Sequence, residues 1–358
     1  MSKTKRTLII IFSVVITLGL FGFMTIYFLF LHHYKGSVVD NPWTNADEFN
    51  IETIAVVEKD PDKDFVILNF ADIQMADLED IFHMKTVKAE LTYLIEQTKP
   101  DIITLTGDQT WSNENLISLK TLVGWLDGFK IPYAPIFGNH DYGNSKNSSV
   151  FDQNKCCDIY ERGKYSLFSR GPSNLGTLGN YVVNIIEDGK VYRTLYMLDS
   201  GYEDKITDKQ IEWFKWNCEG IKNCNGGEYS EGMCFLHKPL PQYSKAYNLL
   251  SYEERAEIDD YYNYSLHGST ENGFFDAAKE RGVKNIVCGH QHGNNFTLSY
   301  QGVSLTFALK TDELGGYIKT DDVYLNGATY FILNSSGTQI KNIYVDENQF
   351  HMTDPINK

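Results

Sequence analysis

Residues 101–108 read DIITLTGD, an apolar run that ends in a glycine and an aspartate. The run is short, rich in isoleucine and threonine, and bounded by polar residues, which is typical of a buried β-strand. Two nearby stretches follow the same pattern, FVILNFAD at residues 65–72 and YAPIFGNHD at residues 133–141. Amphipathic stretches over residues 78–97 and 115–129 predict helices between these strands. The alternation of strands and helices predicts an α/β fold.

The second half of the chain is richer in strands that follow one another directly. YVVNIIED and VYRTLYMLDS are joined across Gly189, and ATYFILN and QIKNIYV are joined across residues 335–337, so both pairs predict antiparallel hairpins. A helix is expected over residues 273–281, and further strands are expected at GMCFLHK, NIVCGH, FTLSY and VSLTFAL. Crossovers followed by hairpins predict mixed sheets instead of one purely parallel sheet.

The composition excludes several classes of protein. The formal net charge of the 358 residues is −15, because 47 Asp and Glu oppose 32 Lys and Arg, and this argues against a nucleic-acid-binding protein. A hydrophobic share of 42% is too high for a disordered chain. Six cysteines are too few for a disulfide-held scaffold, and their pairing cannot be deduced from the sequence.

The N-terminal region predicts a membrane anchor. Residues 7–31 carry no charge and are long enough to cross a hydrocarbon core of about 30 Å. Lys3, Lys5 and Arg6 precede this run, which predicts a cytoplasmic N-terminus. A cleaved signal peptide is the alternative, but the run is longer than usual and no small-residue cleavage site follows it. We therefore predict a cytoplasmic segment over 1–6, a transmembrane signal-anchor helix over 7–31, a tether over 32–64 and an extracytoplasmic domain over 65–358.

Polar residues follow five of the predicted strands, at the strand ends where open α/β sheets bind ligands. Taken singly, a Gly-Asp pair is an ordinary turn, and the two histidines of a His-x-His share a face of any strand. Together they form a set of oxygen and imidazole ligands that folding does not need, and this set suits Mn, Fe or Zn. The clusters are Asp72-Ile73-Gln74, Gly107-Asp108-Gln109, Gly138-Asn139-His140-Asp141, His237 and Gly289-His290-Gln291-His292.

This order of motifs resembles the calcineurin-like metallophosphoesterase family. The surrounding phrases are similar to its single-domain purple-acid-phosphatase-like branch, and they are KPDIITLTGDQ, APIFGNHD, YMLDSG, FLHKPLPQY, NGFF and CGHQHGNNF. The resemblance covers about residues 65–309. It implies a sandwich of two mixed β-sheets flanked by helices, with a centre for two divalent metal ions at one rim.

The resemblance also implies roles for the matching residues. Asp108 would bridge both metals, and His140 would face the phosphate and the leaving group, oriented by Asp141. A metal-bound hydroxide would attack the phosphorus in line. The remaining metal ligands implied in this way are Asp72, Gln74 and His292 at the first metal, with Asn139, His237 and His290 at the second.

Two residues depart from the family pattern. Gln74 stands where most members have histidine, and either its amide oxygen coordinates, which favours Mn or Fe over Zn, or a water takes its place. Trp111 stands where the purple enzymes have a tyrosine ligand. Because an indole offers only a donor, we expect no purple colour and no obligatory ferric iron. Trp111 is then either a wall of the substrate cleft or a core aromatic. Lys238 is a further candidate for a phosphate contact.

We therefore expect a membrane-anchored phosphoesterase, in the first place a phosphomonoesterase, with the lipid bilayer and a phosphate ester as its partners. A phosphodiesterase or nucleotide pyrophosphatase with the same centre is the alternative. A third hypothesis is a binding module that has lost catalysis at Gln74. The sequence has no signature for the physiological substrate, whose specificity lies in loops, or for the oligomeric state.

Overall fold

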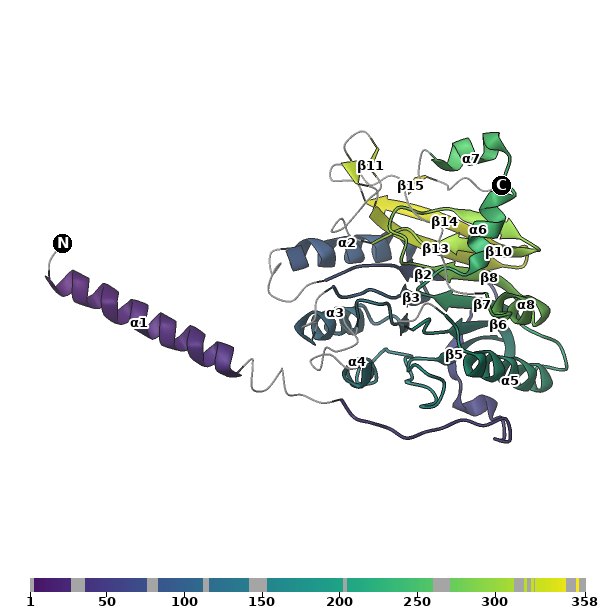
Figure 1. Cartoon of the computed structure of the whole chain (residues 1–358), viewed down its shortest axis with the longest axis horizontal. Helices are drawn as coiled ribbons and strands as arrows, with labels where there is room; N and C mark the ends of the chain where they lie inside the picture. The colour runs from purple at the N-terminus through teal and green to yellow at the C-terminus, as the bar shows by residue number, and fades with distance from the viewer. Residues whose placement is uncertain are drawn as a thin grey trace.

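A computed structural model describes residues 3–26, 36–75, 83–111, 116–141, 153–201, 205–259, 271–311, 319–320, 323–324, 326–345 and 352–353. Within these residues two large β-sheets lie face to face, and helices cover their outer sides (Figure 1). The predicted α/β sandwich of two mixed sheets is confirmed.

The six-stranded sheet holds the first three predicted strands. Its order is β15-β14-β13-β2-β3-β4, and the last three of these strands are parallel to one another. The crossovers between them are α2 (His83–Thr98) and α3 (Leu116–Phe129). Residues 78–82 of the helix predicted over 78–97 lie outside the described residues. The strands are β2 (Phe65–Phe70), β3 (Ile102–Thr106), β4 (Tyr133–Ile136), β13 (Asn326–Asn334), β14 (Gly337–Val345) and β15 (Met352–Thr353). A separate small hairpin pairs β11 (Lys319–Thr320) with β12 (Val323–Tyr324).

The seven-stranded sheet has the order β1-β5-β6-β7-β8-β10-β9 and mixes parallel with antiparallel pairs. Its strands are β1 (Ala55–Glu58), β5 (Tyr181–Glu187), β6 (Lys190–Met197), β7 (Glu231–Leu236), β8 (Val283–Cys288), β9 (Thr297–Tyr300) and β10 (Val303–Phe307). The predicted hairpins β5–β6 and β13–β14 are both present. The remaining helices are α4 (Gln153–Tyr160), which packs against α3, and α5 (Asp208–Cys224), α6 (Pro241–Asn248), α7 (Tyr252–Asp259) and α8 (Phe274–Glu280).

Strand β7 shows why the sequences of the central strands are unbroken apolar runs. Met233 and Phe235 point into the core between the two sheets, where the Phe235 ring lies 6.3 Å from that of Phe331 on β13. Cys234 and Leu236 point the other way and pack in the outer core. Successive side chains of a strand alternate in direction, so a strand covered on both faces needs apolar residues at every position.

Several elements of the fold had no expectation in the sequence, among them β1 and α5. Strand β1 lies within the segment predicted as a tether over 32–64, so the folded unit begins before Phe65. Helix α5 begins at a capping box, in which Thr207 binds the backbone N–H of Gln210 and Gln210 binds that of Thr207. This pattern was a usable signal for a helix start.

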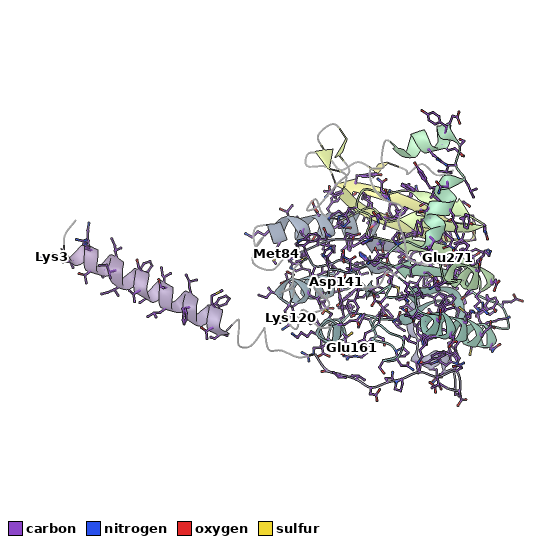
Figure 2. All side chains as sticks on the ribbon, viewed as in Figure 1. Lys3, Met84, Lys120, Asp141, Glu161 and Glu271 are labelled. Carbon is purple, nitrogen blue, oxygen red and sulfur yellow. The ribbon has the colours of Figure 1, made fainter. Side chains whose placement is uncertain are left out.

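Helix α1 (Lys3–Ile26) is long and apolar enough to cross a membrane, with a mean hydropathy of 2.5. Figure 2 shows its side chains projecting on all sides, and none of them is buried. A membrane anchor and a signal sequence both satisfy this criterion. Residues 27–31 of the predicted span lie outside the described residues.

The chain from residue 36 to residue 50, called the strap below, is fixed to the domain near α4. The carboxylate of Asp158 on α4 accepts hydrogen bonds from the backbone and the hydroxyl of Ser37. The guanidinium of Arg170 donates to the Ser37 carbonyl and pairs with Asp158 at 2.8 Å and Glu161 at 2.6 Å. Farther along the strap, Trp43 is buried in the outer core.

Replacing Arg170 should destabilise the domain. Arg170 and Asp158 are only 8% and 5% exposed, so Arg170→Ala leaves a buried carboxylate without its cation. We expect the free energy of unfolding to fall by about 3 kcal/mol. Thermal unfolding of the full chain, followed by circular dichroism, measures the change.

Lys63→Ala is the matched control, because the Lys63–Asp60 pair is largely exposed and its loss should have little effect. If Arg170→Ala and Lys63→Ala lowered the unfolding temperature equally, Arg170 would not stabilise the strap region.

Candidate metal centre

The carboxyl ends of strands from both sheets meet at one rim of the sandwich. Asp72 follows β2, Asp108 follows β3 and Asn139 follows β4, while His237 follows β7 and His290 follows β8. The first three strands belong to one sheet and the last two to the other. Parallel strands within each sheet place their carboxyl ends on the same side, which is why residues so far apart in sequence become neighbours.

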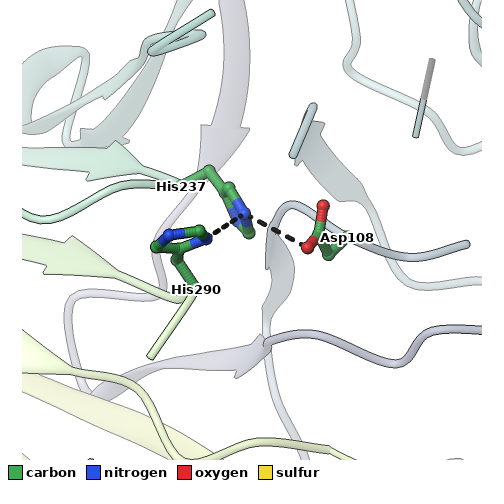
Figure 3. A group of neighbouring side chains, drawn as sticks. All are labelled: Asp108, His237 and His290. Atoms are coloured by element: carbon green, nitrogen blue, oxygen red, sulfur yellow. Dashed lines mark hydrogen bonds and ion pairs between the residues drawn. The ribbon is translucent and has the colours of Figure 1, made fainter. Parts of the chain in front are cut away.

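One group of candidate ligands contains Asp108, His237 and His290, whose ligand atoms all lie within 4.8 Å of one another (Figure 3). Nε2 of His237 is 3.3 Å from Oδ2 of Asp108 and 3.2 Å from Nδ1 of His290. The side-chain oxygen of Asn139 lies 3.1 Å from the same Nε2. These four side chains are the bridging ligand and the second-metal ligands expected from the sequence.

A second group contains Asp72, Asp108 and His292, again within 4.8 Å. Nε2 of His292 is 3.3 Å from Oδ1 of Asp72, and the side-chain amide nitrogen of Gln74 is 3.2 Å from Nε2 of His292. All seven residues expected as ligands therefore lie together. Asp108 belongs to both groups, which is the arrangement that a carboxylate shared by two ions requires.

Four of these residues have left-handed backbones. The φ angles are 53° at Asp72, 56° at Gln74, 52° at Asp108 and 68° at His290, a region that residues other than glycine seldom adopt. Hydrogen bonds hold them there, since His290 N–H donates to the Asp72 carboxylate and Gln74 N–H donates to the Asp108 carbonyl. Such strain is concentrated at functional sites.

Two motif glycines are needed for close approach. A Cβ atom at Gly138 would collide with the backbone nitrogen and Oδ1 of Asp108, and one at Gly289 would lie 2.6 Å from Oδ2 of Asp72. The glycines of the Gly-Asn-His-Asp and Gly-His-x-His motifs thus leave room for the two carboxylates.

The polar atoms at the centre are mostly acceptors. Nδ1 of His237 lies 2.9 Å from the carbonyl oxygen of Thr106, which can only accept, so this nitrogen carries a proton. In the neutral ring Nε2 is then also an acceptor, and it faces Asp108, Asn139 and His290. Converging acceptors suit a cation, and a carbonyl that fixes the tautomer of a ligating histidine is common in metal sites. The donor set therefore fits a metal centre.

The pKa values respond to the same crowding. Burial lowers the pKa of His237, but the Asp108 carboxylate raises it by more, to about 10. Burial raises the pKa of Asp108, and the attraction of His237 and His140 outweighs burial, so that pKa lies well below its ordinary value. Burial and the charge of His237 lower the pKa of His290 to about 3. A proton on His237 thus occupies the place between the acceptors from which a bound cation would displace it.

His140 lies at the edge of the centre. Its backbone N–H donates to Oδ1 of Asp108 at 2.7 Å, and Nε2 of its ring is 3.8 Å from Oδ2 of the same carboxylate. The ring stacks on Trp111, with the centroids 4.2 Å apart and the planes at 28°. Trp111 is 42% exposed, so the alternative that it is a core aromatic is excluded.

Asp141 is buried among backbone donors. One oxygen accepts from the backbone and the hydroxyl of Thr110, and the other accepts from the backbone of Gly138. Burial and the nearby Asp108 carboxylate raise its pKa to about 7. In the described part of the chain these carboxylate bonds go to Thr110 and Gly138, so the role of orienting the His140 ring stays a prediction. What the carboxylate contacts is the pair of loops that carry Asp108 and His140.

Two lysines near the rim are buried. Nζ of Lys310, which is 1% exposed, donates to the carbonyl of Asp72 at 2.7 Å and helps to fix that turn. The sequence reasoning missed Lys310 because nothing in the phrase FALKT indicates a long-range contact. Lys238, 8% exposed, is not simply a solvated lysine, and burial lowers its pKa.

Comparison with known proteins agrees with this geometry. The family model described as calcineurin-like phosphoesterase matches residues 65–294. Probable inactive purple acid phosphatase 29 of Arabidopsis thaliana is 26% identical over an alignment of 247 residues, and the match covers 61% of this chain and 61% of that protein. Phosphatase DCR2 of Saccharomyces cerevisiae is 26% identical over 229 residues, 57% of this chain and 38% of that protein. The chain thus spans about 38–61% of the length of these relatives.

Solved structures align over most of the chain at low identity. A dimetal phosphatase from Danio rerio aligns with a TM-score of 0.47 and 11% identity, over 80% of this chain and 96% of that one. Purple acid phosphatase PPD1 from yellow lupin (Lupinus luteus) seeds aligns with a TM-score of 0.46 and 11% identity, over 81% and 53%. The family match covers more than half of the chain, and it contains every residue of the candidate centre. The chain belongs to the calcineurin-like phosphoesterase family.

Proposed function

We propose that the chain is a phosphoric ester hydrolase that uses two divalent metal ions, with phosphomonoesters as its substrates. The observation that carries the proposal is the position of Asp108 in both groups of candidate ligands. A bound pair of ions supplies Lewis acidity to the phosphoryl oxygens and activates water at neutral pH. The residues that would hold the ions are Asp72, Gln74 and His292 on one side, Asn139, His237 and His290 on the other, and Asp108 between them.

The charge of the ligand set favours a phosphate substrate. Asp72 and Asp108 are the only anionic residues among the seven proposed ligands, so a site loaded with two divalent ions is positive. This local charge attracts a phosphate group although the whole chain is acidic. The buried amine of Lys238 lies on the same rim and adds to that potential.

His140 would assist departure of the alcohol. Nε2 of its ring faces the shared carboxylate at 3.8 Å, beyond a normal hydrogen bond, and the ring is one-fifth exposed. A group with this access can donate a proton to the ester oxygen or hydrogen-bond to the phosphoryl group. Asp141, through its bonds to Thr110 and Gly138, would hold the loops that carry Asp108 and His140 at a fixed distance from each other.

The alternatives share the same centre. A phosphodiesterase or nucleotide pyrophosphatase would use the same ligands, and a binding module would keep the metals without turnover. The relatives from Arabidopsis thaliana carry the word inactive in their names, which describes those proteins. This chain has the candidate leaving-group acid and all seven candidate ligands at one rim, which supports the catalytic proposal.

The setting of the enzyme forms part of the proposal. Helix α1 would serve as an uncleaved signal anchor, with residues 1–6 in the cytoplasm and the domain outside. Support comes from the length and apolar character of α1 and from the basic residues Lys3, Lys5 and Arg6.

Asp108→Asn should abolish hydrolysis. The asparagine keeps the shape of the side chain but loses the charge that two cations would share, so we expect turnover to fall about 100-fold or more. Release of p-nitrophenol from p-nitrophenyl phosphate and from its bis ester by the full chain measures the loss, and the monoester should be the faster substrate of the wild type.

Asp276→Asn is the control, because this aspartate on α8 is exposed and away from the candidate ligands. Normal turnover in Asp108→Asn would contradict the catalytic proposal, and a faster bis ester would favour the phosphodiesterase.

Gly138→Ala should damage the centre without damaging the helices. The added methyl group meets the Asp108 carboxylate and must push it out of place. We expect both activity and metal content, measured by elemental analysis, to fall. Gly124→Ala on α3 is the matched control, since its methyl group meets nothing within 4 Å and the change should leave activity intact and add about 0.5–1 kcal/mol to stability. Full activity in Gly138→Ala would show that Asp108 tolerates displacement.

Gln74→His should shift the metal preference. An imidazole is a softer ligand than an amide oxygen, so we expect the variant to retain more zinc relative to manganese than the wild type. Elemental analysis after equilibration with both metals gives the ratio. An unchanged ratio and content would mean that Gln74 does not coordinate.

A further inference from the structure

Trp111 combines exposure with a fixed position. Its backbone N–H donates to the carbonyl of Met75, and the preceding residue, Thr110, is held by the Asp141 carboxylate. The side chain is nevertheless 42% exposed. One face of the indole lies against the imidazole of His140.

The stack limits the motion of a ring that must aim at a substrate. His140 is anchored at its backbone, where the N–H binds Asp108, but its side chain turns about two single bonds. An aromatic contact at 4.2 Å and 28° restricts the orientations open to that ring. The indole and the Asp108 carboxylate thus limit the positions that Nε2 of His140 can take.

We propose that Trp111 is a positioning residue that holds the imidazole of His140 in line with the leaving group of the phosphate ester. This inference rests on the proposed function and names a residue that the ligand set does not contain. Trp111 cannot itself coordinate either metal ion, because an indole N–H only donates. Its part is to fix the direction from which the proton is delivered.

The proton transfer defines what the variant should lose. As water oxygen bonds to phosphorus, the bond between phosphorus and the ester oxygen breaks, and its electron pair stays on that oxygen. The proton from His140 completes the neutral alcohol. The attacking water releases a proton to solvent, and His140 then takes up a proton from solvent. Departure of an alkyl alcohol needs this proton, whereas p-nitrophenolate leaves readily without it.

The test compares these two kinds of leaving group. Trp111→Ala, Trp111→Phe and the wild type are assayed as full chains on p-nitrophenyl phosphate and on glycerol phosphate, with thermal unfolding and metal content measured for each. In Trp111→Ala we expect kcat to fall about tenfold on glycerol phosphate and little on p-nitrophenyl phosphate, with KM nearly unchanged. Trp111→Phe, which keeps a stacking ring, should restore most of kcat. Tyr252→Ala, which removes an exposed aromatic on α7, is the control and should match the wild type.

Several outcomes would overturn the inference. An equal loss on both substrates, or a loss of metal, would give Trp111 a structural role. A change in KM alone would make it a wall of the substrate cleft. If Trp111→Phe did not restore kcat, the loss in Trp111→Ala would not come from loss of the stacked ring. If the wild type hydrolyses neither ester while it holds metal, the proposed function fails, and the positioning role fails with it; hydrolysis by the wild type with an unaffected Trp111→Ala removes only the inference.

Discussion

The buried carboxylate of Asp108 is the constraint on which the rim depends. It is 1% exposed, and a charge so far from water is very costly unless cations and donors surround it. The His140 N–H and the imidazole of His237 meet that need within the chain. Each comes from a different strand end, so the two sheets must bring their carboxyl edges together for Asp108 to be tolerated. A pair of divalent ions at the same place would satisfy this requirement more fully.

The strands and the motif residues were predictable because both signals are local. An apolar run of five or six residues that ends in Gly-Asp needs no partner to be recognised, and β3 with Asp108 shows this. The resemblance then supplied the order of the ligands and the number of sheets. The segment around Ala55 was not predictable in the same way, because β1 is an edge strand of four residues with one buried position. Such a strand depends on the neighbour it pairs with, here β5.

Tertiary contacts account for the rest of what the sequence did not indicate. The bonds that Thr110 donates to Asp141 and Lys310 donates to Asp72 link residues 31 and 238 positions apart, and no local pattern encodes such pairs. Helix α4 is short and rich in polar residues, yet two of its charged side chains, Lys155 and Asp158, are buried in the domain. Burial of charged residues of this kind reverses the ordinary rule for amphipathic helices, so periodicity alone gives no helix there.

Helix α4 also explains why the strap and the rim form one structure. Asp158, toward its C-terminal end, binds the strap at Ser37, while the thiol of Cys156 donates to the carbonyl of Asp141. Tyr160 reaches Gln109, the residue after the shared carboxylate, at 3.4 Å. Contacts therefore run from the strap, through this helix, to the loops that carry Asp108 and His140. An N-terminal segment that would only tether the domain needs none of these contacts. The strap is therefore part of the folded unit.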